Sequence, residues 1–205
     1  MVNRSRFLAD LFPVQSEQEA QERIAEVKKR YYDARHHCYA FRIGTDGRTA
    51  RSSDDGEPSG TAGMPILHVL TGRDVTNVLI VVTRYFGGIL LGTGGLVRAY
   101  GGAASGVLDQ AGTVRMEPCE CYRMDLSYSA WAELERKLSA AVRIGDIAYT
   151  DRVTVQFCIP VSSGPGPLER VRELLEGRAE PVWTETAVRQ AADAMPGTDR
   201  NGGSL

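Results

Sequence analysis

The sequence predicts an α+β protein built from two α/β-sandwich domains. Thirteen of the 22 glycines lie between Gly56 and Gly112, whereas short charged segments follow Pro118. The apolar run at 78–82 (VLIVV) is typical of a strand that is covered on both faces. After residue 118 the pattern of apolar residues predicts the element order βαββαβ, which is that of a ferredoxin-like sandwich.

In the first block, Ser16 followed by Glu19 forms a capping-box pattern that predicts the start of a helix. Apolar residues of this helix recur at a spacing that places them on one face, namely Ala20, Ile24, Val27 and Tyr31. Asp46-Gly47 predicts a hairpin turn after a strand at 38–44, with a returning strand that ends near residue 53. The other elements expected here are strands at 6–11 and 77–83 and helices at 64–71 and 94–110.

The second block predicts four strands and two helices. The strands are expected at 122–128, 146–149, 153–161 and 182–188, and the helices at 131–142 and 168–175. We place the domain boundary between residues 118 and 119, on Pro118 and on the end of the glycine-rich block. The domains are therefore 1–118 and 119–190, and residues 191–205 are expected to form a disordered tail.

The charge balance argues against a strongly basic nucleic-acid binder. The chain has 205 residues, 24 Lys and Arg, 26 Asp and Glu and a formal net charge of −2. Nucleic-acid binders usually carry a basic surplus, so binding of that kind depends here on a local cluster. The only arginines that the pattern could gather into such a cluster are Arg42, Arg48, Arg51, Arg84 and Arg98.

The sequence also limits the cellular setting. No run approaches the roughly 18 apolar residues of a membrane span, and the first residues lack the pattern of a secretory signal. The four cysteines are scattered in a chain long enough to fold without disulfides: Cys38, Cys119, Cys121 and Cys158. We therefore expect reduced thiols in a cytoplasmic protein, with no membrane contact.

The segment Thr83–Gly102 (TRYFGGILLGTGGLVRAYGG) contains seven glycines and is the first candidate binding site. A strand, a glycine loop and a helix start form a geometry in which free backbone amides point at an anion. The candidate residues are Arg84, Tyr85, Gly92, Gly94, Gly95 and Arg98. For the loop glycines, an ordinary requirement for turns explains the pattern equally well. Gly101, Gly102 and Gly106 are expected to form a small-residue face that packs closely on a neighbouring element.

The segment Ser52–Pro65 (SSDDGEPSGTAGMP) is the second candidate. Its acids Asp54, Asp55 and Glu57 have the chemistry to bind a hard cation or to act as acid and base, but in such loops acids are more often turn formers. Ser59 and Thr61 follow, and Thr61 is expected to cap the next helix and leave exposed amide donors at its start. No GxxxxGK[ST], GxGxxG or GxSxG motif is present, so we assign no catalytic residue, cofactor or metal site.

Four ordered stretches together resemble the YigZ/IMPACT family: HHCYAFRIG (36–44), SDDGEPSGTAGMPIL (53–67), TNVLIVVTRYFGG (76–88) and LGTGGLVRAY (91–100). The resemblance covers most of residues 4–112, and the second block resembles the C-terminal domain of bacterial YigZ proteins. It implies that the first domain has the fold of the second domain of small-subunit ribosomal protein five, with a left-handed βαβ crossover that departs from the usual right-handed rule. It implies that the second domain is like domain five of elongation factor G.

The resemblance also implies a role in translation. Eukaryotic IMPACT proteins act in translational control through an additional N-terminal domain outside the region of resemblance, so their mechanism does not transfer. We expect a non-enzymatic regulator that binds RNA, the ribosome or a translation factor. The alternatives are a small-molecule or phosphate-binding enzyme related in fold to the GHMP kinases, and a protein-binding adaptor.

Overall fold

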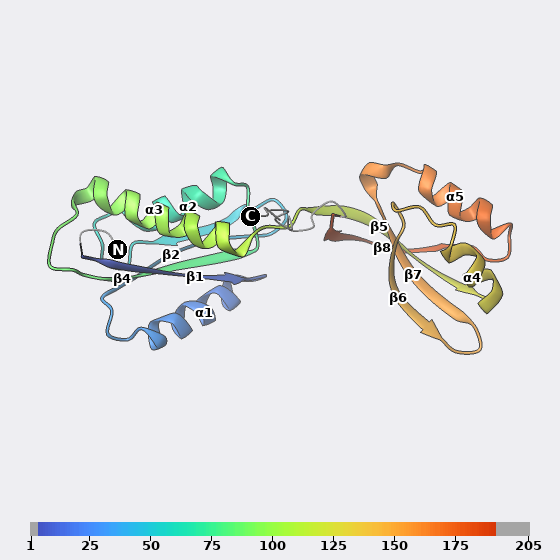
Figure 1. The fold of residues 1–205 in the computed structure, drawn as a ribbon, viewed down its shortest axis with the longest axis horizontal. Coiled ribbons are helices and arrows are strands. Elements are labelled where there is room, and N and C mark those ends of the chain that lie inside the picture. The colour runs from blue at the N-terminus through green and yellow to red at the C-terminus, as the bar shows by residue number, and fades with distance from the viewer. Residues whose placement is uncertain (1–3, 192–205) are drawn as a thin grey trace, which may run out of the picture. The chain divides into compact units, whose positions relative to one another are not determined.

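The computed structural model describes residues 4–191, and the chain divides into two compact units between Thr113 and Val114 (Figure 1). Each unit contains a four-stranded sheet in which all neighbouring strands are antiparallel. The α+β class expected from the sequence is therefore confirmed. Within the described residues, no helix is both long enough and apolar enough to cross a membrane.

The first unit has helices on both faces of its sheet. Its elements are β1 (Arg6–Pro13), α1 (Glu17–Arg30), β2 (His36–Ile43), β3 (Thr49–Ser53), α2 (Gly63–Gly72), β4 (Val78–Tyr85) and α3 (Gly92–Ala111), and the strand order is β1-β4-β2-β3. Figure 1 shows α1 below this sheet and α2 and α3 above it.

Strand β4 is central, and both of its faces are buried. Leu79 and Val81 belong to the apolar cluster that includes α1, whereas Ile80 and Val82 belong to the cluster that includes α2 and α3. This arrangement explains why the run at 78–82 has no polar alternation.

The start of α1 follows the capping pattern in the sequence. The backbone N–H of Glu19 donates to Ser16 Oγ at 3.1 Å. The Glu19 carboxylate accepts from the backbone N–H of Gln15 at 2.8 Å, one residue earlier than the N-cap. The first bond satisfies a donor that a bare helix start leaves unpaired, and the second ties the residue before the cap to the first turn.

The second unit has the βαββαβ order expected from the sequence. Its elements are β5 (Met116–Leu126), α4 (Tyr128–Glu135), β6 (Arg143–Tyr149), β7 (Val153–Pro160), the short 3₁₀ helix η1 (Val161–Ser163), α5 (Gly166–Leu175) and β8 (Val182–Gln190). The strand order is β6-β7-β5-β8, and residues of α4 and α5 share one apolar cluster with β5 and β7. The predicted helix at 131–142 was placed too late, because Ser127 caps α4 by accepting from the N–H of Ala130 at 3.3 Å.

The predicted boundary at 118/119 falls inside β5. Pro118 is paired with Val188 of β8, while pairing with β7 begins only at Cys119. A proline is tolerated in a strand where one side makes no ladder bond, so Pro118 does not end the first unit. The expected tail lies outside the described residues from 192 onward; Ala191 is buried and its N–H donates to Arg115 O.

The expectation of four reduced cysteines is wrong for two of them. Cys121 and Cys158 are direct cross-strand partners in β5 and β7, their Cα atoms are 4.1 Å apart, and a disulfide joins them. Cys38 and Cys119 are free and buried. The pairing depends on strand register between residues 37 apart in sequence, which spacing along the chain does not reveal.

The expectation of close packing at the α3 glycines is also wrong. A Cβ atom added at Gly101, Gly102 or Gly106 would meet nothing within 4 Å. At Gly63, in contrast, an added Cβ would lie 2.7 Å from the backbone nitrogen of Ser53. Close packing therefore explains the glycine at the start of α2 but not the glycines along α3.

The open glycines of α3 predict a stabilising substitution. Gly102→Ala and Gly106→Ala should each raise the free energy of unfolding of the first unit, by up to about 1 kcal/mol, because alanine loses less conformational freedom in a helix. Urea denaturation followed by circular dichroism measures the change. Gly63→Ala is the control and should destabilise the unit; a destabilised Gly102→Ala protein would contradict the structure.

Candidate functional site: a pocket at the start of α3

A pocket with a volume of about 360 Å³ lies in the first unit, where β4 ends and α3 begins. We call it the α3 pocket. Its walls come from the start of β2, the loop before α2, the end of β4 and the first turn of α3. Its lining residues are Arg35, His36, Glu57, Pro58, Arg84, Phe86, Leu90, Leu91, Gly92, Thr93 and Leu96.

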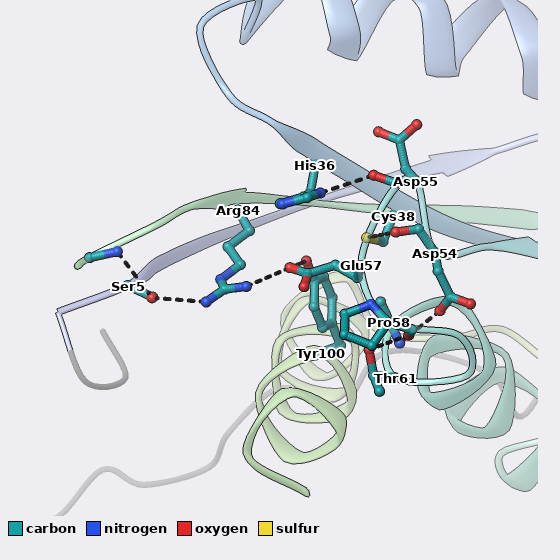
Figure 2. A network of polar contacts seen from close by, with 12 residues as sticks. Ser5, His36, Cys38, Asp54, Asp55, Glu57, Pro58, Thr61, Arg84 and Tyr100 are labelled. Atoms are coloured by element: carbon teal, nitrogen blue, oxygen red, sulfur yellow. Dashed lines mark hydrogen bonds and ion pairs between the residues drawn. The ribbon is translucent and has the colours of Figure 1, made fainter. Parts of the chain in front are cut away.

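A buried ion pair lies at one wall of the pocket. Arg84 Nη1 donates to Glu57 Oε1 at 2.7 Å, and the two side chains are only 7% and 4% exposed. Tyr100 donates its hydroxyl to the same Glu57 oxygen at 2.8 Å, and Arg84 Nη2 donates to Ser5 Oγ at 3.4 Å. Figure 2 shows Glu57 between Arg84 and Tyr100, so one carboxylate links the loop to β4 and α3. Burial, above all, raises the pKa of Tyr100, which keeps this hydroxyl a donor.

Asp54 occupies the amide donors at the start of α2. One of its carboxylate oxygens accepts from the N–H groups of Ala62 and Gly63 at 2.9 and 2.8 Å, and the other accepts from Gly60 at 2.8 Å. Burial raises the pKa of Asp54, but these three hydrogen bonds outweigh it and hold the pKa below its usual range. Thr61 is not the cap, because its hydroxyl donates to the carbonyl of Pro58. Two of the donors expected to be exposed at this helix, the N–H groups of Ala62 and Gly63, are therefore already satisfied.

Asp55 fixes the other side of the same loop. Its carboxylate accepts from Lys28 Nζ at 2.8 Å and from the backbone N–H of His37 at 2.7 Å. Burial raises its pKa, but the bond from Lys28 and the bond from His37 together lower it below the usual range. The backbone carbonyl of Asp55 accepts from His36 Nδ1 at 3.0 Å. All three loop acids are thus engaged in contacts within the chain.

The start of α3 has no such cap. Its N-cap residue is Leu91, which makes no side-chain hydrogen bond to the helix, and Gly92 has a φ of 66°, which favours glycine. Gly92 and Thr93 line the pocket, and Gly94 and Gly95 complete the first turn. Uncapped amides at a helix start attract anions because the N–H dipoles point outward.

The predicted basic cluster does not form. Arg42 is buried and donates to the backbone carbonyls of Gly47, Leu70 and Val75, while Arg48 and Arg51 pair with Asp46 and Glu17. Arg84 is neutralised by Glu57. Arg98 is exposed, and its Nη1 would lie 3.6 Å from a Cβ at Gly94, so it remains beside the start of α3. Within residues 4–191, Arg98 makes no hydrogen bond or ion pair.

Two further predicted site residues lie apart from the pocket. Tyr85 donates its hydroxyl to Asp33 at 2.7 Å, and Ser59 is exposed on the loop. The lining residues that the sequence did not predict are Arg35, His36, Pro58, Phe86, Leu90, Leu91, Thr93 and Leu96. The apolar side chains of Phe86, Ile89, Leu90 and Leu91, between a buried strand and a helix, were the available signal for several of them.

The described residues contain no group of three or more His, Cys, Asp or Glu placed to hold a metal ion. Cys38 lies under the loop, where its thiol donates to the backbone carbonyl of Asp54 at 2.9 Å. Burial raises the pKa of the Cys38 thiol to about 12, so it is a neutral structural group rather than a nucleophile.

The fold and the pocket together define a two-domain α+β protein with a pocket in its first domain. Residues 3–108 match the model of the Impact N-terminal domain. The IMPACT family member YvyE of Bacillus subtilis is 37% identical over 181 residues, which is 88% of this chain and 83% of that protein. The chain therefore belongs to the IMPACT family, as its sequence motifs indicated.

Other relatives extend this comparison. The IMPACT family member YigZ of Escherichia coli is 42% identical over 139 residues, which is 67% of this chain and 68% of that protein. Protein IMPACT of Rattus norvegicus is 38% identical over 94 residues, but these are only 43% of this chain and 29% of that protein. A solved structure described as the crystal structure of an hypothetical protein is 34% identical in sequence. The match covers 90% of this chain and 91% of the chain in that structure, with a TM-score of 0.56.

The buried ion pair predicts an asymmetric mutational result. Glu57→Leu should destabilise the first unit by about 3–5 kcal/mol, because it leaves the buried Arg84 charge without a partner. The double variant Glu57→Leu with Arg84→Met should recover much of this loss, because both charges are removed together. Chemical denaturation of both proteins is the measurement, and a double variant as unstable as the single one would contradict the assignment.

The Asp54 cap predicts a pH-dependent contribution. Asp54→Ala should cost about 0.5–2 kcal/mol at pH 7, since it removes the acceptor for the amides at the start of α2. The folded-state pKa of Asp54 is lowered, so the contribution is fully present above its ordinary value of 3.8 and is lost as the pH falls through the folded pKa. Denaturation curves at pH 7 and pH 3 should show the difference between the two proteins shrinking at the lower pH; a constant difference would exclude an ionised cap.

Proposed function

We propose that this chain is a non-enzymatic protein of translation that binds RNA, on its own or in the ribosome, through the surface around the α3 pocket. The observation that carries the proposal is the uncapped start of α3, which opens on this pocket beside two exposed arginines, Arg35 and Arg98. Within the described residues neither arginine makes a hydrogen bond or ion pair. Free guanidinium groups and helix-start amides both bind phosphate oxygens.

Fold likenesses support the same proposal. We infer that the first unit resembles the second domain of small-subunit ribosomal protein five and that the second unit resembles domain five of elongation factor G. Both of those proteins act on the ribosome, and the βαββαβ order of the second unit agrees with the second likeness. A shared fold does not by itself assign a shared partner, so the surface around the pocket remains the main support.

The enzyme alternative receives less support. In that alternative Asp54, Asp55 and Glu57 would hold Mg²⁺ for phosphoryl transfer, but each carboxylate already has partners within the chain. Releasing any of them would leave buried donors or a buried charge unsatisfied. The adaptor alternative would use exposed apolar side chains, such as Trp183 on β8, to bind a protein.

The proposal includes a cytoplasmic location, which follows from the expected role in translation. Cys121 and Cys158 are paired rather than reduced, so the cysteines do not support this location. The location is tested by fractionation, independently of RNA binding.

RNA binding by this surface predicts a measurable salt dependence. The logarithm of the association constant for a structured RNA should fall linearly with the logarithm of the salt concentration, since bound counterions are released from phosphates. Arg35→Ala and Arg98→Ala should each reduce the steepness of this line by about one unit. Arg48→Ala is the matched control, because Arg48 is an exposed arginine paired with Asp46 away from the pocket. A slope near zero for the unmodified chain would exclude the proposal.

A further inference from the structure

The α3 pocket contains an aromatic ring placed to stack on a flat ligand. Phe86 lines the pocket and is 52% exposed, which is unusual for a phenylalanine. The guanidinium carbon of Arg84 lies 5.5 Å from the centre of the Phe86 ring. A cation held against an aromatic ring, with the ring still exposed, matches the platforms on which proteins stack unpaired bases.

Arg84 also has donor capacity that the chain does not use. The residue is 6% exposed, and its Nε is buried without a hydrogen-bond partner within the described residues. Its terminal nitrogens bind Glu57 and Ser5. Buried N–H groups are nearly always satisfied, so this group marks a place where the contacts that the chain makes to a residue of the pocket lining are incomplete. This observation is independent of the helix start.

His36 presents a hydrogen-bond acceptor to the same pocket. Its Nδ1 contacts the backbone carbonyl of Asp55 at 3.0 Å. A carbonyl can only accept, so Nδ1 carries the proton, and Nε2 of the neutral ring is left as an acceptor. In Figure 2 the second nitrogen of His36 faces away from Asp55, toward the side of Arg84. An acceptor beside a stacking ring suits a base that carries an amino group.

The part of the pocket that is lined by the start of α3 suits a phosphate. Gly92 and Thr93 lie in the uncapped first turn of α3, and the guanidinium of Arg98 lies beside Gly94. The volume of about 360 Å³ falls at the lower end of the range of roughly 300–1,000 Å³ for small-molecule sites, so there is room for a single nucleotide rather than a helix of nucleic acid.

We propose that the α3 pocket takes one nucleoside monophosphate unit of an unpaired RNA strand. The base stacks on Phe86, the His36 Nε2 accepts from the amino group of adenine or cytosine, and the phosphate binds the first-turn amides of α3 and Arg98. This subsite rests on the proposed function, because RNA supplies the nucleotide. A free nucleotide offers the same chemistry, so the experiment includes both sources.

The test is a titration of the full chain followed by amide NMR, with AMP, CMP, UMP, adenosine and inorganic phosphate as separate probes. AMP and CMP should bind saturably and shift the signals of His36, Phe86 and Gly92–Gly95, and both should bind more tightly than UMP. Inorganic phosphate should shift only the signals of Gly92–Gly95. Phe86→Ala should weaken AMP about tenfold or more and leave phosphate binding unchanged, because one stacking contact is lost.

Two control variants separate stacking from damage to the fold. Phe86→Tyr retains the ring and should retain AMP binding. Tyr32→Ala removes another exposed aromatic, 84% accessible and outside the pocket, and should have no effect. Equal AMP affinity in Phe86→Ala and the unmodified chain, or no saturable AMP or CMP binding, would overturn the subsite.

The same variants tested with a single-stranded RNA oligonucleotide distinguish the two proposals. Salt-dependent RNA binding that Phe86→Ala leaves unchanged would overturn the subsite while the proposed function stands. AMP binding that depends on Phe86, without binding of any RNA, would overturn both the proposed function and RNA as the source, and would identify a free-nucleotide site. Loss of AMP affinity and of RNA affinity in Phe86→Ala by similar factors would support the subsite.

Discussion

The pocket depends on one buried ion pair, between Arg84 at the end of β4 and Glu57 in the loop before α2. Two charges removed from water are costly unless additional hydrogen bonds support the pair. Here Tyr100 supplies a second donor to the carboxylate, and Ser5 supplies an acceptor to the guanidinium. The pair joins segments 27 residues apart and holds an otherwise polar, glycine-rich loop against the core. Asp54, Asp55 and Thr61 hold the rest of this loop, and the ion pair is the contact that ties its Glu57 side chain to β4.

The acidic motif of this family is thus mainly architectural in this chain. Asp54 caps α2, Asp55 ties the loop to α1 and β2, and Glu57 neutralises Arg84. With the carboxylates committed, the groups left to contact a ligand are backbone amides, exposed arginines, a histidine and apolar side chains. These groups bind and orient molecules and offer no general acid or base of the carboxylate type. The proposal of a binding protein agrees with this arrangement, in which the carboxylates hold the fold and the remaining groups can contact a ligand.

The sequence predicted those features that depend on local chemistry. Neighbouring residues or the local pattern of apolar residues were enough to predict three features: the Ser16–Glu19 cap, the strand at 78–82 that is covered on both faces, and the βαββαβ order. It did not predict features that depend on which distant residues meet. Asp54 reaches Gly63 across a folded loop and so displaces Thr61 as the cap, and His36 lines the same pocket as the start of α3 because β2 pairs with β4. The family resemblance identified the motifs but not their contacts.

The covalent link between β5 and β7 gives the two units different dependence on their surroundings. Cys121 and Cys158 close a loop that contains α4 and β6. A cross-link of this kind restricts the unfolded chain and so raises the free energy of unfolding by roughly 2–4 kcal/mol. The first unit contains only Cys38, which is buried and free. A reducing environment would therefore lower the stability of the second unit and leave the stability of the first unit, which carries the pocket, unchanged. The redox state of the surroundings can thus control the lifetime of one unit without affecting the other.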